Sequence, residues 1–263
     1  MRQAAHGRSY LLNPVYSDTM CRLFALVAER SRSPELPDLM RQFREQSRQH
    51  PDGWGFGWFF DGRPQVEKSP AAAFDDPRFM TTCMSADSNI VMAHIRKSSG
   101  TPRTPENTHP FFYGGYIFAH NGSVHAKRDL AEIMPKEYRD RIQGQTDSER
   151  LFHWILYHID QRGGDIIEGI REAIEYVKAN RGPETSAFNF VMSDGEAVYA
   201  YRLAYCKLDH YSLMYRIREE TDKYPGRSVI ISSQRLGRGE WRAIDNDTLL
   251  VVDKLRNIET HSF

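Results

Sequence analysis

The order of apolar and polar segments predicts an α+β domain built on antiparallel sheets. Apolar runs typical of strands come first, two amphipathic helical segments follow from Thr146 and over about 165–180, and strand-like runs then return. Turn dipeptides such as Asp61-Gly62 and Asp194-Gly195 separate neighbouring runs, as in hairpins. Strands, then two adjacent helices, then more strands are typical of an α+β fold.

Each element is predicted from its own pattern. Residues 50–60 alternate glycine with aromatic side chains, which indicates a strand with another segment packed closely against its backbone. The expected strands are 21–28, 50–60, 65–68, 88–96, 116–120, 187–192, 197–203, 228–233 and 248–252. A helix is expected over about 38–49, and the Ser-, Thr-, Pro- and Gly-rich segment 97–109 is expected to be a loop.

Composition excludes several classes of partner. The 35 basic and 35 acidic residues give zero net charge, so no basic surface for nucleic acid or an anionic membrane is expected. Cys21, Cys83 and Cys206 form no C-x-x-C pair, which argues against a disulfide framework or a zinc site and favours a cytoplasmic location. No apolar stretch approaches the ~20 residues needed to span a bilayer.

Cys21 opens the first strand-like run and directly follows Met20. If the chain began at Cys21, one residue would carry a thiol and a free α-amine, which together form a nucleophile with its own base. The alternative is a core cysteine, because free cysteine is among the most buried residue types. The sequence alone leaves both open.

Other segments carry side chains suited to a polar ligand. Arg96 ends a buried strand, where a guanidinium suits either a surface ion pair or a carboxylate. Asn121-Gly122 is either a turn or a pair of oxyanion donors. Thr146 and Glu149 match a capping box, and Asp147 in that first helical turn can also pair with an ammonium group. Together with Cys21, these groups describe a pocket for an α-amino acid amide.

The chain resembles the class II glutamine amidotransferases, which are N-terminal-nucleophile hydrolases, and in particular their small stand-alone branch that includes the amidohydrolase of ergothioneine synthesis. The matching motifs are Met20-Cys21-Arg22-Leu23, His50-Pro51-Asp52-Gly53-Trp54-Gly55, Ala93-His94-Ile95-Arg96, Glu106-Asn107-Thr108-His109-Pro110-Phe111, Phe118-Ala119-His120-Asn121-Gly122 and Thr146-Asp147-Ser148-Glu149. The resemblance covers nearly all of 21–263.

The resemblance implies a four-layer αββα sandwich and a role for each matching residue. Cys21 would be the nucleophile, and Asn121 and Gly122 would form the oxyanion hole. The substrate α-carboxylate would bind Arg96, its α-amine would bind Asp147, and Ser99 would line the pocket where the family often has threonine. No cofactor or metal is implied, and His94, His109 and His120, which lack metal-ligand spacing, are expected to be packing residues.

Two segments near the expected substrate-binding residues depart from the pattern of the synthetase-linked members. Those members follow the arginine with Trp-Ala-Thr-His, whereas this chain has Lys97-Ser98-Ser99-Gly100. They also carry arginine before the Gly-x-Asp element, where this chain has Gln49-His50-Pro51-Asp52.

The expected activity is hydrolysis of the γ-carboxamide of glutamine or a γ-glutamyl compound through a γ-glutamyl thioester. Alternatives are a γ-glutamyl amidohydrolase acting on a larger metabolite, or a non-catalytic amino-acid-binding partner protein. The ammonia would be released into water, or it would pass to a small acceptor or to a separate synthetase subunit. A free amine on Cys21 requires loss of residues 1–20, which we interpret as a leader, a prosegment or a start codon placed too far upstream.

Overall fold

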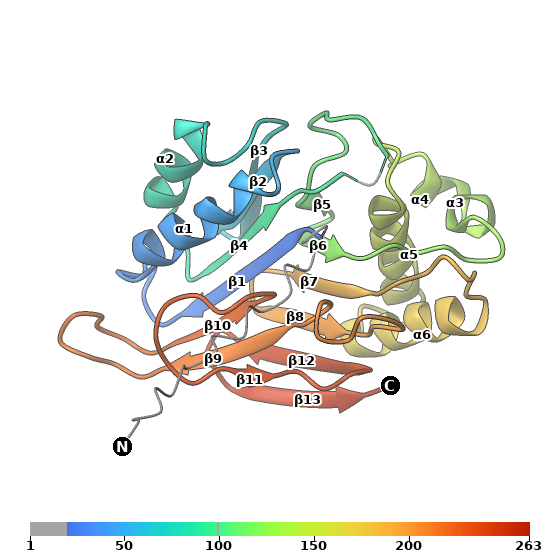
Figure 1. Cartoon of the computed structure of the whole chain (residues 1–263). Helices are drawn as coiled ribbons and strands as arrows, with labels where there is room; N and C mark the ends of the chain where they lie inside the picture. Colours follow the sequence, from blue (N-terminus) through green and yellow to red (C-terminus); the bar gives the residue numbers. More distant parts are fainter. Residues whose placement is uncertain (1–19, 99) are drawn as a thin grey trace, which may run out of the picture.

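Two antiparallel sheets lie face to face at the centre of the molecule in a computed structural model, which describes residues 20–98 and 100–263 (Figure 1). The first sheet has the order β11 (Arg242–Ala243), β9 (Met214–Arg218), β10 (Ser228–Ser232), β1 (Arg22–Ala28), β4 (Ile90–Ile95), β2 (Trp54–Phe60) and β3 (Arg63–Ser69). The second has the order β13 (Ile258–Ser262), β12 (Thr248–Asp253), β8 (Ala197–Arg202), β7 (Asn189–Ser193), β6 (Tyr116–Asn121) and β5 (Phe111–Tyr113).

Helices cover the outer face of each sheet. The helices are α1 (Leu36–Glu45), with the short 3-10 helix η1 (Gln46–Arg48) after it, α2 (Pro77–Ser85), α3 (Leu130–Ile133), α4 (Lys136–Arg139), α5 (Asp147–Gln161) and α6 (Ile166–Ala179). Figure 1 shows α1 and α2 beside the first sheet and α5 and α6 beside the second. This arrangement confirms the predicted α+β fold and its four αββα layers.

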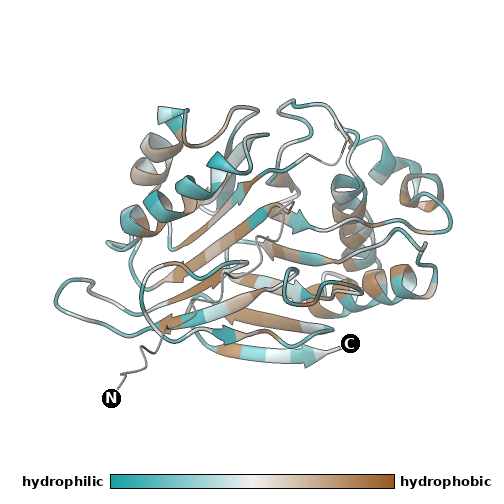
Figure 2. Cartoon of the chain, in the orientation of Figure 1, coloured by the Kyte–Doolittle hydropathy of each residue, from teal (hydrophilic) through white to brown (hydrophobic). Residues whose placement is uncertain are grey.

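Strand β1 shows why these layers form. All seven of its residues are buried. Alternate side chains of a strand point to opposite faces, so Phe24 and Leu26 pack under α1 and α2, whereas Leu23 and Ala25 pack between the two sheets. A strand buried on both faces reads as a continuous apolar run, as this one does. In Figure 2 apolar residues follow the central strands, and hydrophilic ones mark much of α1.

The predicted close approach to the glycine-rich strand is present at β2. A Cβ atom added to Gly55 would lie 2.0 Å from the carbonyl oxygen of His109. Only glycine therefore allows the segment before β5 to pack on the backbone of β2. That contact brings His109 from the connection between the sheets into the interior.

Some boundaries differ from those that the sequence predicts. The helix expected over 38–49 is α1, which ends at Glu45 and tightens into η1. There the Ser47 hydroxyl donates to the carbonyl of Arg44 and accepts from the backbone N–H of Phe74, so the chain is fixed by side-chain bonds as the helix ends. Elements that the sequence pattern did not indicate include α2, the short helices α3 and α4, strand β9, and the edge strands β5, β11 and β13.

The strand ends determine where polar chemistry can gather. Strands β1 and β4 are antiparallel, with Arg22 opposite Ile95. The start of β1 therefore lies beside the end of β4, and Cys21 and Arg96 are neighbours at that end of the two strands. Strand β6 of the second sheet ends at Asn121 and contacts β1 across the interface. No helix in the described part of the chain is long and apolar enough to cross a membrane.

Candidate active site

Cys21 borders a small cavity of about 60 Å³, which lies where β1 begins and β4 ends. The lining residues come from five separate segments of the chain: Cys21, Arg96, Lys97, Ser98, Thr101, His109, His120, Gly122, Thr146, Asp147 and Ser148. We call this space the Cys21 cavity. It brings together Cys21, Arg96, Gly122 and Asp147, which the sequence had placed in one pocket.

The thiol of Cys21 is held by the backbone of Lys97. The Lys97 N–H donates to Sγ at 3.2 Å, and the thiol faces the Lys97 carbonyl at 3.4 Å. Burial raises the pKa of the Cys21 thiol, while the Lys97 N–H and the charges of Arg96 and Arg22 act in the opposite direction. The net effect is a protonated thiol, which needs a base before it can attack.

Arg96 follows β4 and is buried, with 3% of its surface exposed. Its Nη2 donates to Thr101 Oγ1 at 2.6 Å and to the Thr101 carbonyl at 3.2 Å, and it lies 3.3 Å from Ser98 Oγ. Nη1 faces the carbonyl of Asp52 at 3.4 Å. The guanidinium is therefore fixed at the cavity by neutral oxygens, an arrangement that leaves its charge available to an anion.

Asp52 holds the loop that follows Arg96, a role that sequence reasoning did not assign. Its Oδ2 accepts from the Ser98 N–H at 2.8 Å, and its Oδ1 forms an ion pair with Arg103 at 2.6 Å. The Asp52 backbone N–H also donates to the Arg96 carbonyl. Asp52 belongs to the His-Pro-Asp-Gly-Trp-Gly motif, which is the one sequence signal that could have pointed to it.

Strand β6 ends at Asn121, and Gly122 after it has a backbone conformation that side chains disfavour. Gly122 has a φ of +146°, and a Cβ atom there would lie 2.1 Å from the carbonyl oxygen of Ala187. Asn121 is buried, and within the described chain its Nδ2 has no hydrogen-bond partner. A buried amide donor without a partner costs free energy, which a ligand oxygen could recover.

Asp147 is the first residue of α5. Its Oδ2 accepts from the Val124 N–H at 2.6 Å and its Oδ1 from the Ser148 N–H at 2.8 Å. Only half of the predicted capping box forms: Thr146 accepts from the Glu149 N–H, but the Glu149 carboxylate accepts from the N–H groups of Gln143 and Gly144. Both acids thus fix the loop geometry before the helix begins.

Three buried histidines lie between the two sheets at the cavity, and two of them, His109 and His120, line it. His94 from β4 and His109 have ring centres 4.3 Å apart, and His120 from β6 hydrogen-bonds through Nδ1 to Ser148 Oγ at 2.8 Å. Burial lowers the pKa of all three, so they are neutral near pH 7. Within the described ranges no group of His, Cys, Asp or Glu side chains is arranged to hold a metal ion.

Two expectations fall outside the described residues. Ser99, expected to line the pocket, is one, and residues 1–19 are the other.

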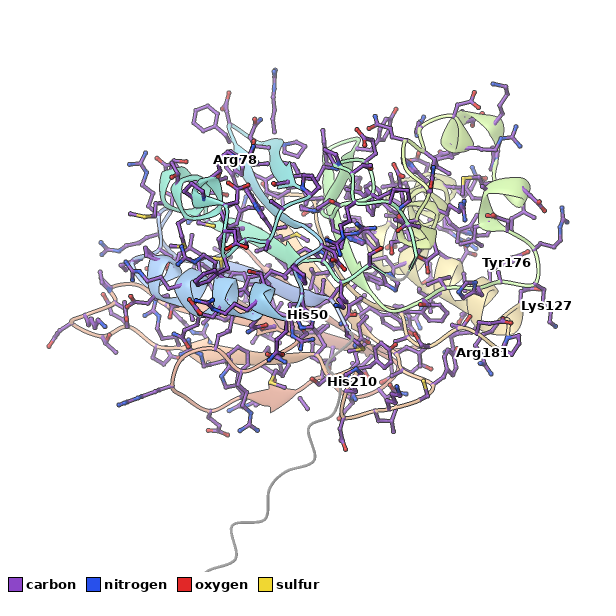
Figure 3. The ribbon with its side chains drawn as sticks, turned by 45° about the horizontal axis from the view of Figure 1, so that its top comes forward. His50, Arg78, Lys127, Tyr176, Arg181 and His210 are labelled. Atoms are coloured by element: carbon purple, nitrogen blue, oxygen red, sulfur yellow. The ribbon has the colours of Figure 1, made fainter. Side chains whose placement is uncertain are left out.

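The motif that contributes Asp52 begins at His50, which Figure 3 shows near the middle of the molecule, beyond the end of α1.

Comparisons with known proteins identify the family. The model of class II glutamine amidotransferases matches residues 20–261. An uncharacterized protein of Methanocaldococcus jannaschii is 30% identical over 261 residues, covering 88% of this chain and 69% of the relative. The probable glutamine amidotransferase DUG3 of Saccharomyces cerevisiae is 27% identical over 250 residues, with 77% and 70% covered.

A shorter match and a solved structure were also found. The gamma-glutamyl-hercynylcysteine sulfoxide hydrolase of Mycobacterium tuberculosis is 35% identical over 74 residues, 28% of this chain and 32% of that protein. A solved structure described as a glutamine aminotransferase class-II domain protein from Silicibacter pomeroyi has the same fold, with a TM-score of 0.66 at 19% identity, covering 92% of this chain and 99% of that one. This chain belongs to the family of class II glutamine amidotransferases.

Proposed function

We propose that this protein hydrolyses the γ-carboxamide of glutamine or of a γ-glutamyl compound, with Cys21 as its nucleophile. The observation that supports this most directly is the convergence of Cys21, Arg96, Gly122 and Asp147 on one cavity. These groups supply a thiol, a cation for an α-carboxylate, a backbone donor for an oxyanion and an anion for an α-amine.

The proposed reaction begins with the α-amine of Cys21, freed by loss of residues 1–20. Its reference pKa of ~7.7–8.0 lies close to the ~8.5 of a thiol, so transfer of the thiol proton to the amine is nearly balanced. The thiolate then attacks the γ-carbonyl carbon. Asn121 Nδ2, which has no partner in the described chain, and the Gly122 N–H would stabilise the oxyanion that forms.

The tetrahedral intermediate collapses when the carbon–nitrogen bond breaks. The leaving nitrogen takes the proton from the Cys21 ammonium and departs as ammonia or an amine, which leaves a γ-glutamyl thioester on Sγ. Water, activated by the same amine, then hydrolyses the thioester and releases glutamate. Ammonia could also pass to a small acceptor or to a separate synthetase subunit. We propose that the protein carries out this reaction in the cytoplasm.

A γ-glutamyl group on a larger metabolite is the second candidate substrate. It is favoured by the partial similarity to the mycobacterial enzyme whose name describes hydrolysis of a γ-glutamyl compound. Initial rates of ammonia release from glutamine, compared with amine release from γ-glutamyl amides, would separate the two. A rate with glutamine more than tenfold above every γ-glutamyl amide would remove the second candidate.

The nucleophile is tested in a chain that begins at Cys21, with its N-terminus verified by intact mass. We expect Cys21→Ala to abolish turnover while glutamine still binds by calorimetry, because the side chains that bind the amino acid remain. Cys206→Ala is the matched control, since Cys206 is an exposed free cysteine outside the cavity. Equal turnover in Cys21→Ala and Cys206→Ala would remove the nucleophile assignment, and full activity in a chain that retains residues 1–20 would remove the α-amine.

A further inference from the structure

A second and larger cavity, of about 670 Å³, lies beside α1 on the outer side of the first sheet. Its walls are α1, strand β9, the loop that connects β9 to β10, and the segment after β10. Figure 1 shows that loop extending away from the sheet on the side of α1. No lining residue of this space, which we call the α1 cavity, also lines the Cys21 cavity.

The α1 cavity carries an excess of positive charge. Its ionisable lining residues are five cations and two anions: Arg41, Arg216, Arg218, Lys223, Arg238, Glu35 and Asp38. The chain as a whole has zero net charge, so this cluster is a local concentration rather than a general property of the surface. A concave site with an excess of one sign attracts ligands of the opposite sign.

The two innermost cations share a single carboxylate. Arg216 and Arg218 are each more than nine-tenths buried, and both form ion pairs with Glu35, at 3.4 and 2.8 Å. Glu35 also accepts from the Ser228 hydroxyl. Two buried guanidinium groups on one carboxylate leave one positive charge without an anion among these three residues, which is costly away from water.

The remaining bonds of these arginines are to neutral groups. Arg216 donates to the Arg238 carbonyl, and Arg218 donates to the carbonyls of Glu219 and Tyr224. In the described chain Arg216 Nε has no hydrogen-bond partner, and the guanidinium lies 5.6 Å from the centre of the Trp241 ring. The planar forks are therefore held in fixed positions, and one of their buried donors has no hydrogen-bond partner within the described residues.

The outer anion does not balance the outer cations. Asp38 is contacted by Arg41 at 2.6 Å, by Lys223 at 3.5 Å and by the Tyr224 hydroxyl at 2.5 Å. Arg238 has an exposed side chain at the same rim. Flexible cations around buried, fixed guanidinium groups are suited to an anion that presents several oxygens.

We propose that the α1 cavity binds a small molecule with a phosphate-type group of two or more negative charges. Guanidinium forks match the oxygens of phosphate groups in pairs, and the cavity volume lies within the ~300–1,000 Å³ typical of small-molecule sites. The ligand charge would compensate the buried charge that Glu35 leaves unbalanced. The site is separate from the proposed amide hydrolysis and does not depend on it.

Calorimetric titration tests the proposal with the full chain carrying Cys21→Ala, so that no turnover contributes heat. The probes are inorganic pyrophosphate, inorganic phosphate and ADP at constant 0.15 M ionic strength. We expect saturable binding of one pyrophosphate or ADP per chain, at least tenfold tighter than inorganic phosphate, because several cations act together. Absence of saturable binding by all three probes would overturn the proposal.

Rim variants show whether binding occurs in this cavity. The double variant Lys223→Gln/Arg238→Gln should weaken pyrophosphate binding tenfold or more, whereas Lys136→Gln/Arg139→Gln, which removes the same charge from α4, should leave it unchanged. Equal weakening in both would show a general charge effect and overturn the site. A hexaglutamate peptide that bound as tightly as pyrophosphate, with the same dependence on the rim, would overturn the small-molecule assignment.

The buried arginine gives a further test that keeps the charge. Arg216→Lys retains a cation but loses the fork, so pyrophosphate affinity should fall at least tenfold while the circular dichroism spectrum stays the same. Unchanged affinity in a folded Arg216→Lys variant would contradict recognition by the fork. If this variant does not fold, the rim variants still decide the question, because their side chains are exposed.

Discussion

The two halves of the candidate active site are held in place by different means. On the first sheet, Arg96 and the loop after it depend on polar contacts with Asp52 and Thr101. On the side of the second sheet, Gly122 is fixed by close backbone packing against Ala187, and Asp147 at the start of α5 is fixed by backbone N–H groups. The difference predicts that a substitution at Gly122 disturbs the backbone geometry and lowers kcat. Substitutions at Arg96 and Asp52 should instead weaken substrate binding and raise KM.

The largest effect is expected from Gly122→Ala. Its Cβ would meet the Ala187 carbonyl oxygen at 2.1 Å, so the backbone that carries the proposed oxyanion donor must shift. Loss of one such donor costs about 10²–10³ in kcat. Gly62→Ala is the control, because Gly62 also has a positive φ but open space around it. Similar kcat values for the two variants would contradict the proposed role of Gly122.

A smaller effect on substrate binding is expected from Arg96→Lys. Lysine keeps the charge but cannot present two parallel donors to a carboxylate, so KM for glutamine should rise on the order of 10²-fold with little change in kcat. A matched titration with a glutamine analogue lacking the α-carboxylate should show no difference between the variant and the parent. Unchanged KM for glutamine would exclude Arg96 from carboxylate binding.

The histidines at the junction of the halves predict the pH dependence of stability. Burial lowers the pKa of His94 to about 3, whereas the unfolded value is ~6.5. Between these values only the unfolded chain takes up the proton, so the free energy of unfolding falls by about 1.4 kcal/mol per pH unit below 6.5 for this residue.

Urea unfolding at pH 7.5 and 5.5 checks this sign. Asp76, whose pKa is lowered to about 2 by bonds from Arg78, Ser69 and Trp54 that outweigh its burial, loses its stabilising effect only below pH ~4, outside that window. Equal free energies of unfolding at the two pH values would show that the histidines are not held neutral.

The smallest effect is expected from Asp52→Asn, which acts through the loop that it holds. The variant can still accept from the Ser98 N–H but loses the ion pair with Arg103, so KM should rise about tenfold while kcat changes little. Arg32→Gln, which breaks the exposed pair between Arg32 and Asp87 at the opposite end of β4 from this loop, is the control. A fall in kcat without a change in KM would contradict a positioning role.

Much of the fold is readable from local pattern. Strand β1 is a continuous apolar run because both of its faces are buried, and the glycines of β2 indicate the close approach that His109 makes. Helix α2 also has a readable start, Asp76 as N-cap followed by Pro77, although the sequence analysis did not use it. The division of the strands between two sheets is not readable, since an apolar run does not specify its neighbour.

The same limit applies to the site. Cys21, Arg96, Gly122 and Asp147 could be chosen from the sequence because each lies beside the end of a strand or at the start of a helix, where polar groups can line a pocket. Asp52 could not be assigned a role, because its contact with the Ser98 N–H joins residues 46 positions apart. Contacts across such distances depend on strand order, which local pattern does not contain.

The contact between Arg22 and Met20 has a consequence for the pH at which the proposed nucleophile would become active. Arg22 Nη1 donates to the buried Met20 carbonyl at 2.9 Å and lies 3.3 Å from the Cys21 carbonyl. Cleavage before Cys21 would exchange the first of these oxygens for an amine beside a guanidinium. A neighbouring cation disfavours protonation. The new terminus would thus remain a free base at lower pH than an ordinary chain end.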